Sequence, residues 1–270
     1  GPGSEHIKQA KITGKEYSSG NLTAQFIERN AVAWAIDPAT GNAKRSTPRT
    51  TDVEMQVCAQ CHSRRGQIAD GYKPGMNFHD YYRAAALAPG LYHADGQQRD
   101  EVYISGSFEQ SKMYKAGVTC SDCHDPHTQK LKAEGNAVCA GCHLPAKYDS
   151  VTHHRHPQGS TGAQCANCHM PETTYMVIDP RRDHSMRIPR PDISVITGAP
   201  NACNNCHRED DAAWAAEAIK SWGVTQPKGF QQFSGAYHAA ATNSPDVNVQ
   251  LANVASNLMH PAIARAGQCC

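Results

Sequence analysis

Large apolar side chains are scarce in this chain. Leu, Ile, Val and Phe together account for 37 of its 270 residues, which is below the roughly 20% at which a chain usually builds its own core. Such scarcity normally accompanies disorder when the net charge is high. Here the formal net charge is only +1, so composition predicts neither an ordinary apolar core nor a disordered chain.

Long apolar runs and a charge excess are also missing. No stretch approaches the roughly 20 apolar residues that a membrane helix needs, so we expect no transmembrane segment in this chain. No signal peptide is visible, and we expect one to have been removed or to lie upstream. The 26 basic residues are balanced by 25 acidic ones, which excludes an electrostatic case for nucleic-acid binding.

Cysteine, by contrast, is present in one repeated pattern. Five C-x-x-C-H motifs use ten of the twelve cysteines. They are Cys58, Cys61 and His62; Cys120, Cys123 and His124; Cys139, Cys142 and His143; Cys165, Cys168 and His169; and Cys203, Cys206 and His207.

This motif is the attachment signature of c-type haem. Two thiols add to the two vinyl groups of one haem, and the adjacent His binds the iron as its proximal ligand. Zinc ribbons, with four Cys for each metal, give no reason for a His after every second Cys. A disulfide framework does not require the same spacing five times. The sequence therefore predicts five covalent haems.

Five porphyrins would also supply the missing apolar mass. We expect the core to be mostly cofactor and the apoprotein not to fold. Motifs two, three and four start only 19 and 26 residues apart, so neighbouring haems should lie nearly in contact. Because haem is joined to such motifs outside the cytoplasmic membrane, we expect a periplasmic or extracellular protein.

The sequence between the motifs predicts a few elements of secondary structure. Ala31–Asn42 is typical of a strand entering a turn at Asp37-Pro38. Residues 81–87 have the pattern of a short helix, and 210–222 that of a longer one with Gly223 as its C-cap. Residues 224–236 are predicted as a loop, and 247–259 and 261–266 as amphipathic helix. The proline-rich segment around His184 predicts a loop that covers haem faces.

Several segments resemble one family of multihaem cytochromes. The similarity to this family covers about residues 50–215. It includes the segments 90–96, 106–113, Cys123–His127, His153–His156, Cys168–Pro171 and Arg182–Ser185. The chain is similar to periplasmic or extracellular multihaem c-type cytochromes in which a haem domain often precedes tetratricopeptide or HEAT-like repeats. The resemblance implies electron transfer as the default role, and residues from Val247 look like the start of such a repeat.

Together these patterns predict a mainly α chain with much irregular loop. We expect a multihaem cytochrome c fold organised around stacked haems, with a short N-terminal β-hairpin. Three parts are expected: an N-terminal segment, 1–57, packing on the haem domain; a pentahaem domain, 58–209; and a C-terminal helical segment, 210–270.

The distal iron ligands must come from outside the motifs. The chain has fifteen histidines, of which five are proximal ligands and ten remain. We rank highest those in or beside the haem-dense region and the resembling segments: His93, His127, His154, His156 and His184, followed by His79. His6 gains weight if the N-terminus is native. In an extended segment His153 would point away from His154, which favours a propionate or backbone partner for it.

The remaining candidates rank lower. His238 and His260 lie in the tail and are expected at the surface, and Met113 is the one methionine considered as a distal ligand. The cationic residues of the clusters Arg181-Arg182 and Arg187–Arg190 are expected to pair with haem propionates rather than to form a docking patch.

Three functions follow from these features. The first is electron transfer through a row of five haems, mostly bis-His ligated, to redox partner proteins or, by self-association through end haems, along a filament. The second is a multihaem reductase of a small nitrogen or sulfur oxyanion with one open haem. The third is a haem-bearing module whose tail docks a partner. All motifs end in His, not the Lys found at some nitrite-reducing haems, which favours electron transfer over enzymatic activity.

Both chain ends carry open questions. Gly1–Ser4 reads either as a scar left by cleavage of a tag or as the text that commonly follows a C-x-x-C-H motif upstream. Cys269 and Cys270 cannot form a sixth attachment motif in this sequence, and we read them as free thiols or a bond to a partner.

Overall fold

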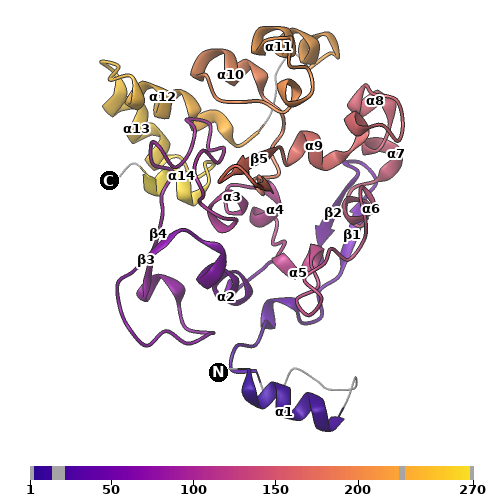
Figure 1. Ribbon diagram of the computed structural model, residues 1–270, viewed down its shortest axis with the longest axis vertical. Coiled ribbons are helices and arrows are strands. Elements are labelled where there is room, and N and C mark those ends of the chain that lie inside the picture. Colours follow the sequence, from indigo (N-terminus) through magenta and orange to yellow (C-terminus); the bar gives the residue numbers. More distant parts are fainter. Residues whose placement is uncertain (1–2, 14–21, 225–228, 268–270) are drawn as a thin grey trace.

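The computed structural model describes residues 3–13, 22–224 and 229–267. Short helices joined by irregular loops dominate the fold (Figure 1). The α-helices are α1 (Ser4–Thr13), α2 (Val53–His62), α3 (Ser105–Phe108), α4 (Lys112–Lys115), α5 (Cys120–Cys123), α6 (Ala137–Ala140), α7 (Pro145–Tyr148), α8 (Val151–His154), α9 (Cys165–His169), α10 (Pro191–Thr197), α11 (Ala212–Ser221), α12 (Ser234–Ala241), α13 (Val247–Ser256) and α14 (Ala262–Ala266). The predicted mainly α fold class with much loop is confirmed.

Single 3₁₀ turns and small hairpins complete the fold. The 3₁₀ turns are η3 (Ile27–Arg29), η4 (Phe78–Asp80), η5 (Thr161–Ala163), η6 (Cys203–Asn205) and η7 (Gln231–Phe233). The strands are β1 (Trp34–Asp37), β2 (Asn42–Arg45), β3 (Arg65–Gln67), β4 (Tyr82–Ala84), β5 (Glu172–Tyr175) and β6 (Asp179–Arg182). They form three separate two-stranded antiparallel pairs, β1-β2, β3-β4 and β5-β6.

The predicted N-terminal hairpin is present as β1 and β2. Asp37 starts its turn by accepting the backbone N–H of Ala39 at 2.9 Å. Gly41 closes it with a φ of +73°, and a Cβ there would lie 2.8 Å from the side chain of Lys147. The turn therefore needs glycine both for its backbone conformation and for the close approach of α7.

The predicted helix at 81–87 is wrong. Residues 82–84 are strand β4, paired with β3. Tyr82 is buried and stacks on Phe78, with ring centroids 5.0 Å apart. Aromatic packing and a strand partner far along the sequence have overridden the local pattern.

Towards the C-terminus the predictions held better. Helix α11 begins where Asp211 accepts the N–H of Trp214 at 2.8 Å, and Gly223 follows it with a φ of +87°. Helices α13 and α14 are present as predicted. The predicted loop 224–236 is wrong at its end, because α12 begins at Ser234; its residues 225–228 lie outside the described part.

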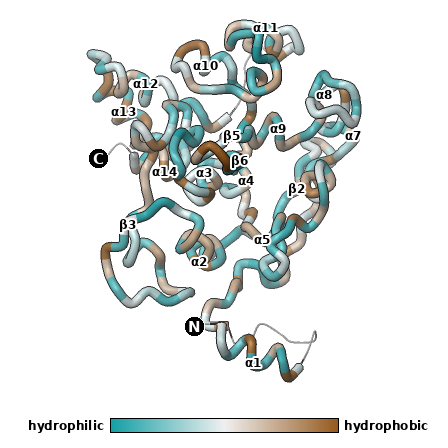
Figure 2. The backbone as a smooth tube through the Cα atoms, in the orientation of Figure 1, coloured by the Kyte–Doolittle hydropathy of each residue, from teal (hydrophilic) through white to brown (hydrophobic). Residues whose placement is uncertain are grey.

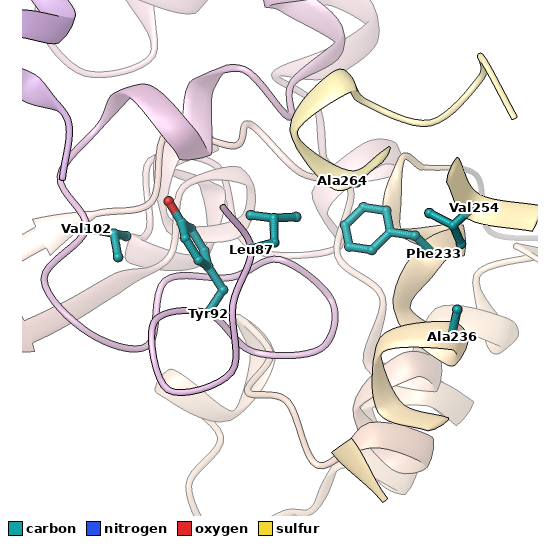
Figure 3. Packing of buried hydrophobic residues seen from close by; sticks show 7 residues of the cluster. All are labelled: Leu87, Tyr92, Val102, Phe233, Ala236, Val254 and Ala264. Carbon is teal, nitrogen blue, oxygen red and sulfur yellow. The ribbon is translucent and has the colours of Figure 1, made fainter. Parts of the chain in front are cut away.

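Apolar packing is limited to small clusters. The largest joins Leu87, Tyr92 and Val102 to residues of the C-terminal helices: Phe233, Ala236, Val254 and Ala264 (Figure 3). Hydrophobic residues are otherwise scattered along the chain (Figure 2). Helices α12, α13 and α14 therefore pack on the preceding part of the chain, and the three-part division of the sequence stays a prediction.

Within the described ranges, every helix is too short or too polar to cross a bilayer.

Candidate haem-binding sites

Each C-x-x-C-H motif lies on a single helical turn. The motifs lie at the end of α2, on α5, at α6, on α9 and at η6. In three of them the His N–H donates to the carbonyl of the first Cys: His124 to Cys120 at 3.0 Å, His143 to Cys139 at 2.9 Å, and His207 to Cys203 at 2.9 Å. A helical turn brings residues three apart to one face, so both thiols can reach one flat ligand.

The ten motif cysteines are all free of disulfides. Only Cys61 of the first motif and Cys206 of the last are exposed, whereas the others are half-buried. The proximal histidines follow the same pattern, since His62 and His207 are exposed and the three between them are half-buried.

Cysteines of successive motifs lie against one another. The thiols of Cys58 and Cys120 lie close enough to shift each other's pKa, and so do those of Cys139 and Cys165. These contacts join motif one to two and motif three to four.

Electrostatic contacts complete this series. Cys123 of motif two lies within electrostatic range of Cys142, and Cys168 of motif four within that of Cys203 and Cys206. Cysteines of each motif therefore lie near cysteines of the next motif in the sequence. In Figure 1, α5, α6 and α9 follow one another along one side of the molecule.

Several histidines use Nδ1 for a hydrogen bond to a protein oxygen. His169 Nδ1 pairs with the carbonyl of Arg187 at 2.7 Å, His184 Nδ1 with that of Arg182 at 2.9 Å, and His156 Nδ1 with that of His154. A carbonyl can only accept, so Nδ1 carries the proton and Nε2 keeps its lone pair. Metal-bound histidines are oriented in this way.

Three proximal histidines each face a histidine from outside the motifs. The ring centroids of His124 and His184 are 6.4 Å apart, those of His169 and His153 are 6.2 Å apart, and those of His207 and His156 are 6.2 Å apart. A metal–nitrogen bond of about 2 Å and a further ~1.1 Å to the ring centre, taken on both sides, give about 6.2 Å for two imidazoles sharing one iron. The three separations match the one expected for two imidazoles on a single iron.

Burial favours the uncharged form of these ligand candidates. It holds the pKa of His124, His143, His153, His169 and His184 below the ordinary 6.5. A metal binds the neutral imidazole, so the site favours the form that iron requires.

Only some of the predicted distal ligands lie near a motif histidine. His184 and His156 face motif histidines, and so does His153, which the sequence ranked low. The segment holding His153 is helix α8, so the premise that it is extended was wrong. The ring centroids of His154 and His156 are 6.5 Å apart. The Nε2 atom of His154 is buried and has no hydrogen-bond partner.

Other candidates lie elsewhere. The ring centroids of His127 and His6 are 6.3 Å apart. His79 is exposed and packs edge-on against Phe78, and His93 is half-buried near Asp95 and Arg187, with burial lowering its pKa. Met113 packs in the cluster of Met55, Phe108 and Val118. His238 and His260 are half-buried rather than at the surface as predicted.

The arginine clusters pair with carboxylates of the protein. Arg187 is buried and contacts Asp95 at 3.1 Å and Asp183 at 3.6 Å. Arg181 pairs with Glu101 at 2.6 Å. Arg182 and Arg190 pair with Glu172 at 3.9 Å and Asp192 at 2.6 Å. These arginines thus already have anionic partners without the predicted haem propionates.

Two residues that sequence analysis missed hold motifs three and four. Asn42, on β2, places Oδ1 2.8 Å from His143 Nδ1, and its neighbour Ala43 donates to the carbonyl of Cys142 at 2.7 Å. Asn136 accepts the N–H of Cys165 and donates to the carbonyl of Ala163, both at 2.9 Å. The residues around Asn42 and Asn136 form no motif that predicts these bonds, because each side chain bonds a group that is distant in the chain or belongs to the backbone.

A buried carboxylate joins motifs one and two. Glu54, on α2, is 1% exposed and accepts the N–H of Ser121, on α5, at 2.6 Å. Arg29 lies 3.7 Å from Glu54 and 3.2 Å from Asp122. Asp122 in turn accepts the N–H of Thr119 at 2.8 Å, which caps the turn of motif two. This network fixes α5 on α2 and thereby one haem site beside the next.

Comparisons with known proteins agree with the motifs. Residues 112–148 match the family model described as Doubled CXXCH motif, and they contain motifs two and three. The crystal structure of Outer Cell Wall Cytochrome OcwA is similar at a TM-score of 0.45 and 18% identity, covering 78% of this chain and 60% of that one. This chain thus spans less than two thirds of that protein. No curated protein matches the chain in sequence.

The five motifs and the doubled-motif match over residues 112–148 support covalent c-type haems attached through C-x-x-C-H motifs.

Proposed function

We propose that this chain transfers electrons along a row of five covalently attached c-type haems, most of them bis-His ligated. The supporting observation is the proximity of cysteines in successive motifs: Cys58 to Cys120, Cys123 to Cys142, Cys139 to Cys165, and Cys168 to Cys203. Haems joined to adjacent sulfurs lie close together, and electron tunnelling falls steeply with distance. The proposed path therefore follows the sequence order of the motifs.

The two ends of the row are its proposed points of entry and exit. Only the first and last motifs carry an exposed cysteine, Cys61 and Cys206, and their histidines are exposed as well. Partners would be redox proteins that dock there or further copies that join end to end into a filament. Because c-type haem is attached outside the cytoplasm, the proposed location is the periplasm or the cell exterior.

The proposed distal ligands are His184 for the second haem, His153 for the fourth and His156 for the fifth. Each faces its proximal histidine at the separation that one iron requires. His79, His93 and His154 remain candidates for the first and third haems.

A second function has one observation in its favour. Among the described residues, no imidazole faces His62 or His143 in the way that His184 faces His124. An iron with an open sixth position could bind a small nitrogen or sulfur oxyanion, which is the reductase alternative.

Two measurements test the proposal. The intact mass of the denatured protein should show five haem additions, and four or fewer would mean that at least one motif is unused. After reduction, CO should bind to none of the haems if they are all bis-His ligated. Binding of one or two CO per chain would indicate open irons and would place the reductase ahead of the electron-transfer protein.

A further inference from the structure

A fourth pair of histidines has the same spacing as the three ligand pairs. The rings of His6 and His127 have centroids 6.3 Å apart and planes inclined by 22°, against 6.4 Å and 25° for His124 and His184. Each of the other three pairs contains one motif histidine. Neither His6 nor His127 follows a C-x-x-C sequence, so this pair belongs to no attachment motif.

A closed loop presents His127 to helix α1. Asp125 Oδ1 accepts the backbone N–H of His127 at 2.9 Å and that of Thr128 at 2.8 Å. The N–H of Asp125 donates to the carbonyl of Lys130 at 2.8 Å, and that of Gln129 to the carbonyl of Asp125 at 2.8 Å. Two backbone–backbone hydrogen bonds and two from backbone N–H groups to the Asp125 carboxylate thus hold the loop that carries one member of the pair, while α1 carries the other.

We propose that His6 and His127 bind a sixth, non-covalently held haem as its two axial ligands. Two imidazoles alone make a poor site for a bare metal ion, since such sites usually use three or four protein ligands. The described residues contain no group of three or more His, Cys, Asp or Glu side chains that could hold one. A porphyrin supplies four nitrogens itself, so its iron requires only two from the protein.

The covalent haems are excluded from this site by their own chemistry. A haem attached through a C-x-x-C-H motif already has the motif histidine on one axial position. Only one further axial position remains, so it cannot accept both His6 and His127. A haem that uses both must lack a motif histidine, and it is therefore a b-type haem.

Side chains on both segments suit a porphyrin. Ile7, next to His6, is 54% exposed, and Leu131, on the strand-like segment after the loop, is 48% exposed. Either can cover an apolar macrocycle. Lys11 on α1, and Lys130 and Lys132 after His127, lie close in sequence to the two histidines and are cations of the kind that pair with propionates, whereas Lys8 already pairs with Glu5 at 2.6 Å.

The test adds hemin to the purified protein with its covalent haems in place. One equivalent should bind, giving a low-spin spectrum and a b-type pyridine haemochrome that acidified organic solvent removes. His6→Ala and His127→Ala should each lower the affinity at least about tenfold, because one of two axial bonds is lost. His238→Ala, a half-buried histidine outside the pair, should bind hemin as the unmodified protein does.

Two outcomes would overturn the proposal. The first is the absence of stoichiometric uptake, or uptake that His6→Ala and His127→Ala leave unchanged. The second is conversion of a covalent haem to high spin in His127→Ala without added hemin, which would make His127 the distal ligand of a motif haem. The inference uses the same ligation geometry as the proposed function but does not depend on the electron path, because a count of five covalent haems by mass stands or falls separately.

Discussion

At the residue scale, the separation of imidazole rings discriminates between neighbouring histidines. Residues 153, 154 and 156 follow one another closely, and the sequence favoured His154 over His153. In helix α8 adjacent side chains diverge by about 100°, so only one of His153 and His154 can point at a given iron. The ring of His153 lies 6.2 Å from that of His169, which selects it for the fourth haem.

Replacing His153 with Ala should therefore open one iron. We expect one haem to change from low to high spin and to bind one CO per chain after reduction, because water or CO can take the vacated position. His184→Ala should do the same at the second haem. Electronic absorption and CO titration measure both effects.

His238→Ala is the matched control, since His238 lies on α12 and faces no motif histidine among the described residues. It should leave all the haems low-spin. An unaltered spectrum in His153→Ala would show that another side chain holds the fourth iron.

Glu109 should make stability depend on pH. Burial raises the pKa of its carboxyl to about 7, with Asp52 adding to the effect and Arg49 opposing it. Because the folded pKa lies above the ordinary 4.5, the protonated form is favoured in the fold. Its contribution is complete below about pH 4.5 and is lost as the pH rises through about 7.

Glu109→Gln should remove this dependence, because the amide stays neutral. Between pH 5 and pH 8 the unmodified protein should lose up to about 3 kcal/mol more unfolding free energy than the variant. Guanidinium denaturation at the two pH values gives the difference. The exposed Glu217 provides the control, since Glu217→Gln should preserve the full pH dependence.

At the scale of elements, loops rather than sheets orient the ligands. The carbonyl of Arg187 holds His169 Nδ1, and the guanidinium of Arg187 is fixed by Asp95 and Asp183. All three side chains are 5–6% exposed. A buried ion network thus joins the loop around Asp95 to the segment before α10 and stabilises the orientation of a proximal ligand.

Removing Asp95 should be costly. Asp95→Ala leaves Arg187 buried with a single carboxylate, and breaking a buried pair costs about 3–5 kcal/mol. The surface pair of Arg64 and Asp100, 44% and 51% exposed at 2.9 Å, offers a matched control, for which Asp100→Ala should cost under about 1 kcal/mol. Denaturation midpoints compare the two. Equal losses would mean that burial does not decide the strength of these pairs.

The same elements show what the sequence could predict. The C-x-x-C-H motifs, the hairpin at Asp37–Gly41 and helix α11 carry their signal within a few residues, through spacing, turn chemistry and capping. Strand β4, the pairing of His124 with His184 and the bond from Asn42 to His143 depend on partners between roughly 15 and 100 residues away in the chain. No local pattern encodes such contacts, so the proximal sites could be predicted and the distal geometry could not.

At the scale of the whole molecule, the proposed electron path passes through the attachment sites in sequence order. Haem three would have two neighbours, through Cys142 with Cys123 and through Cys139 with Cys165, whereas haem five would have one, through Cys203 with Cys168. In a compact cluster each haem would instead touch several others. The number of neighbours disturbed when one haem is deleted therefore reveals the arrangement.

Deleting haem three with Cys139→Ser and Cys142→Ser should shift the midpoint potentials of two remaining haems, because each loses a charged neighbour. Deleting haem five with Cys203→Ser and Cys206→Ser should shift only one. Potentiometric titration followed by magnetic circular dichroism counts the shifted haems, and intact mass verifies that one haem is missing from each variant. Electron transfer from one end to the other should stop in the first variant, because a missing central haem roughly doubles the tunnelling gap. Two or more shifted haems after deletion of haem five would rule out a line in sequence order.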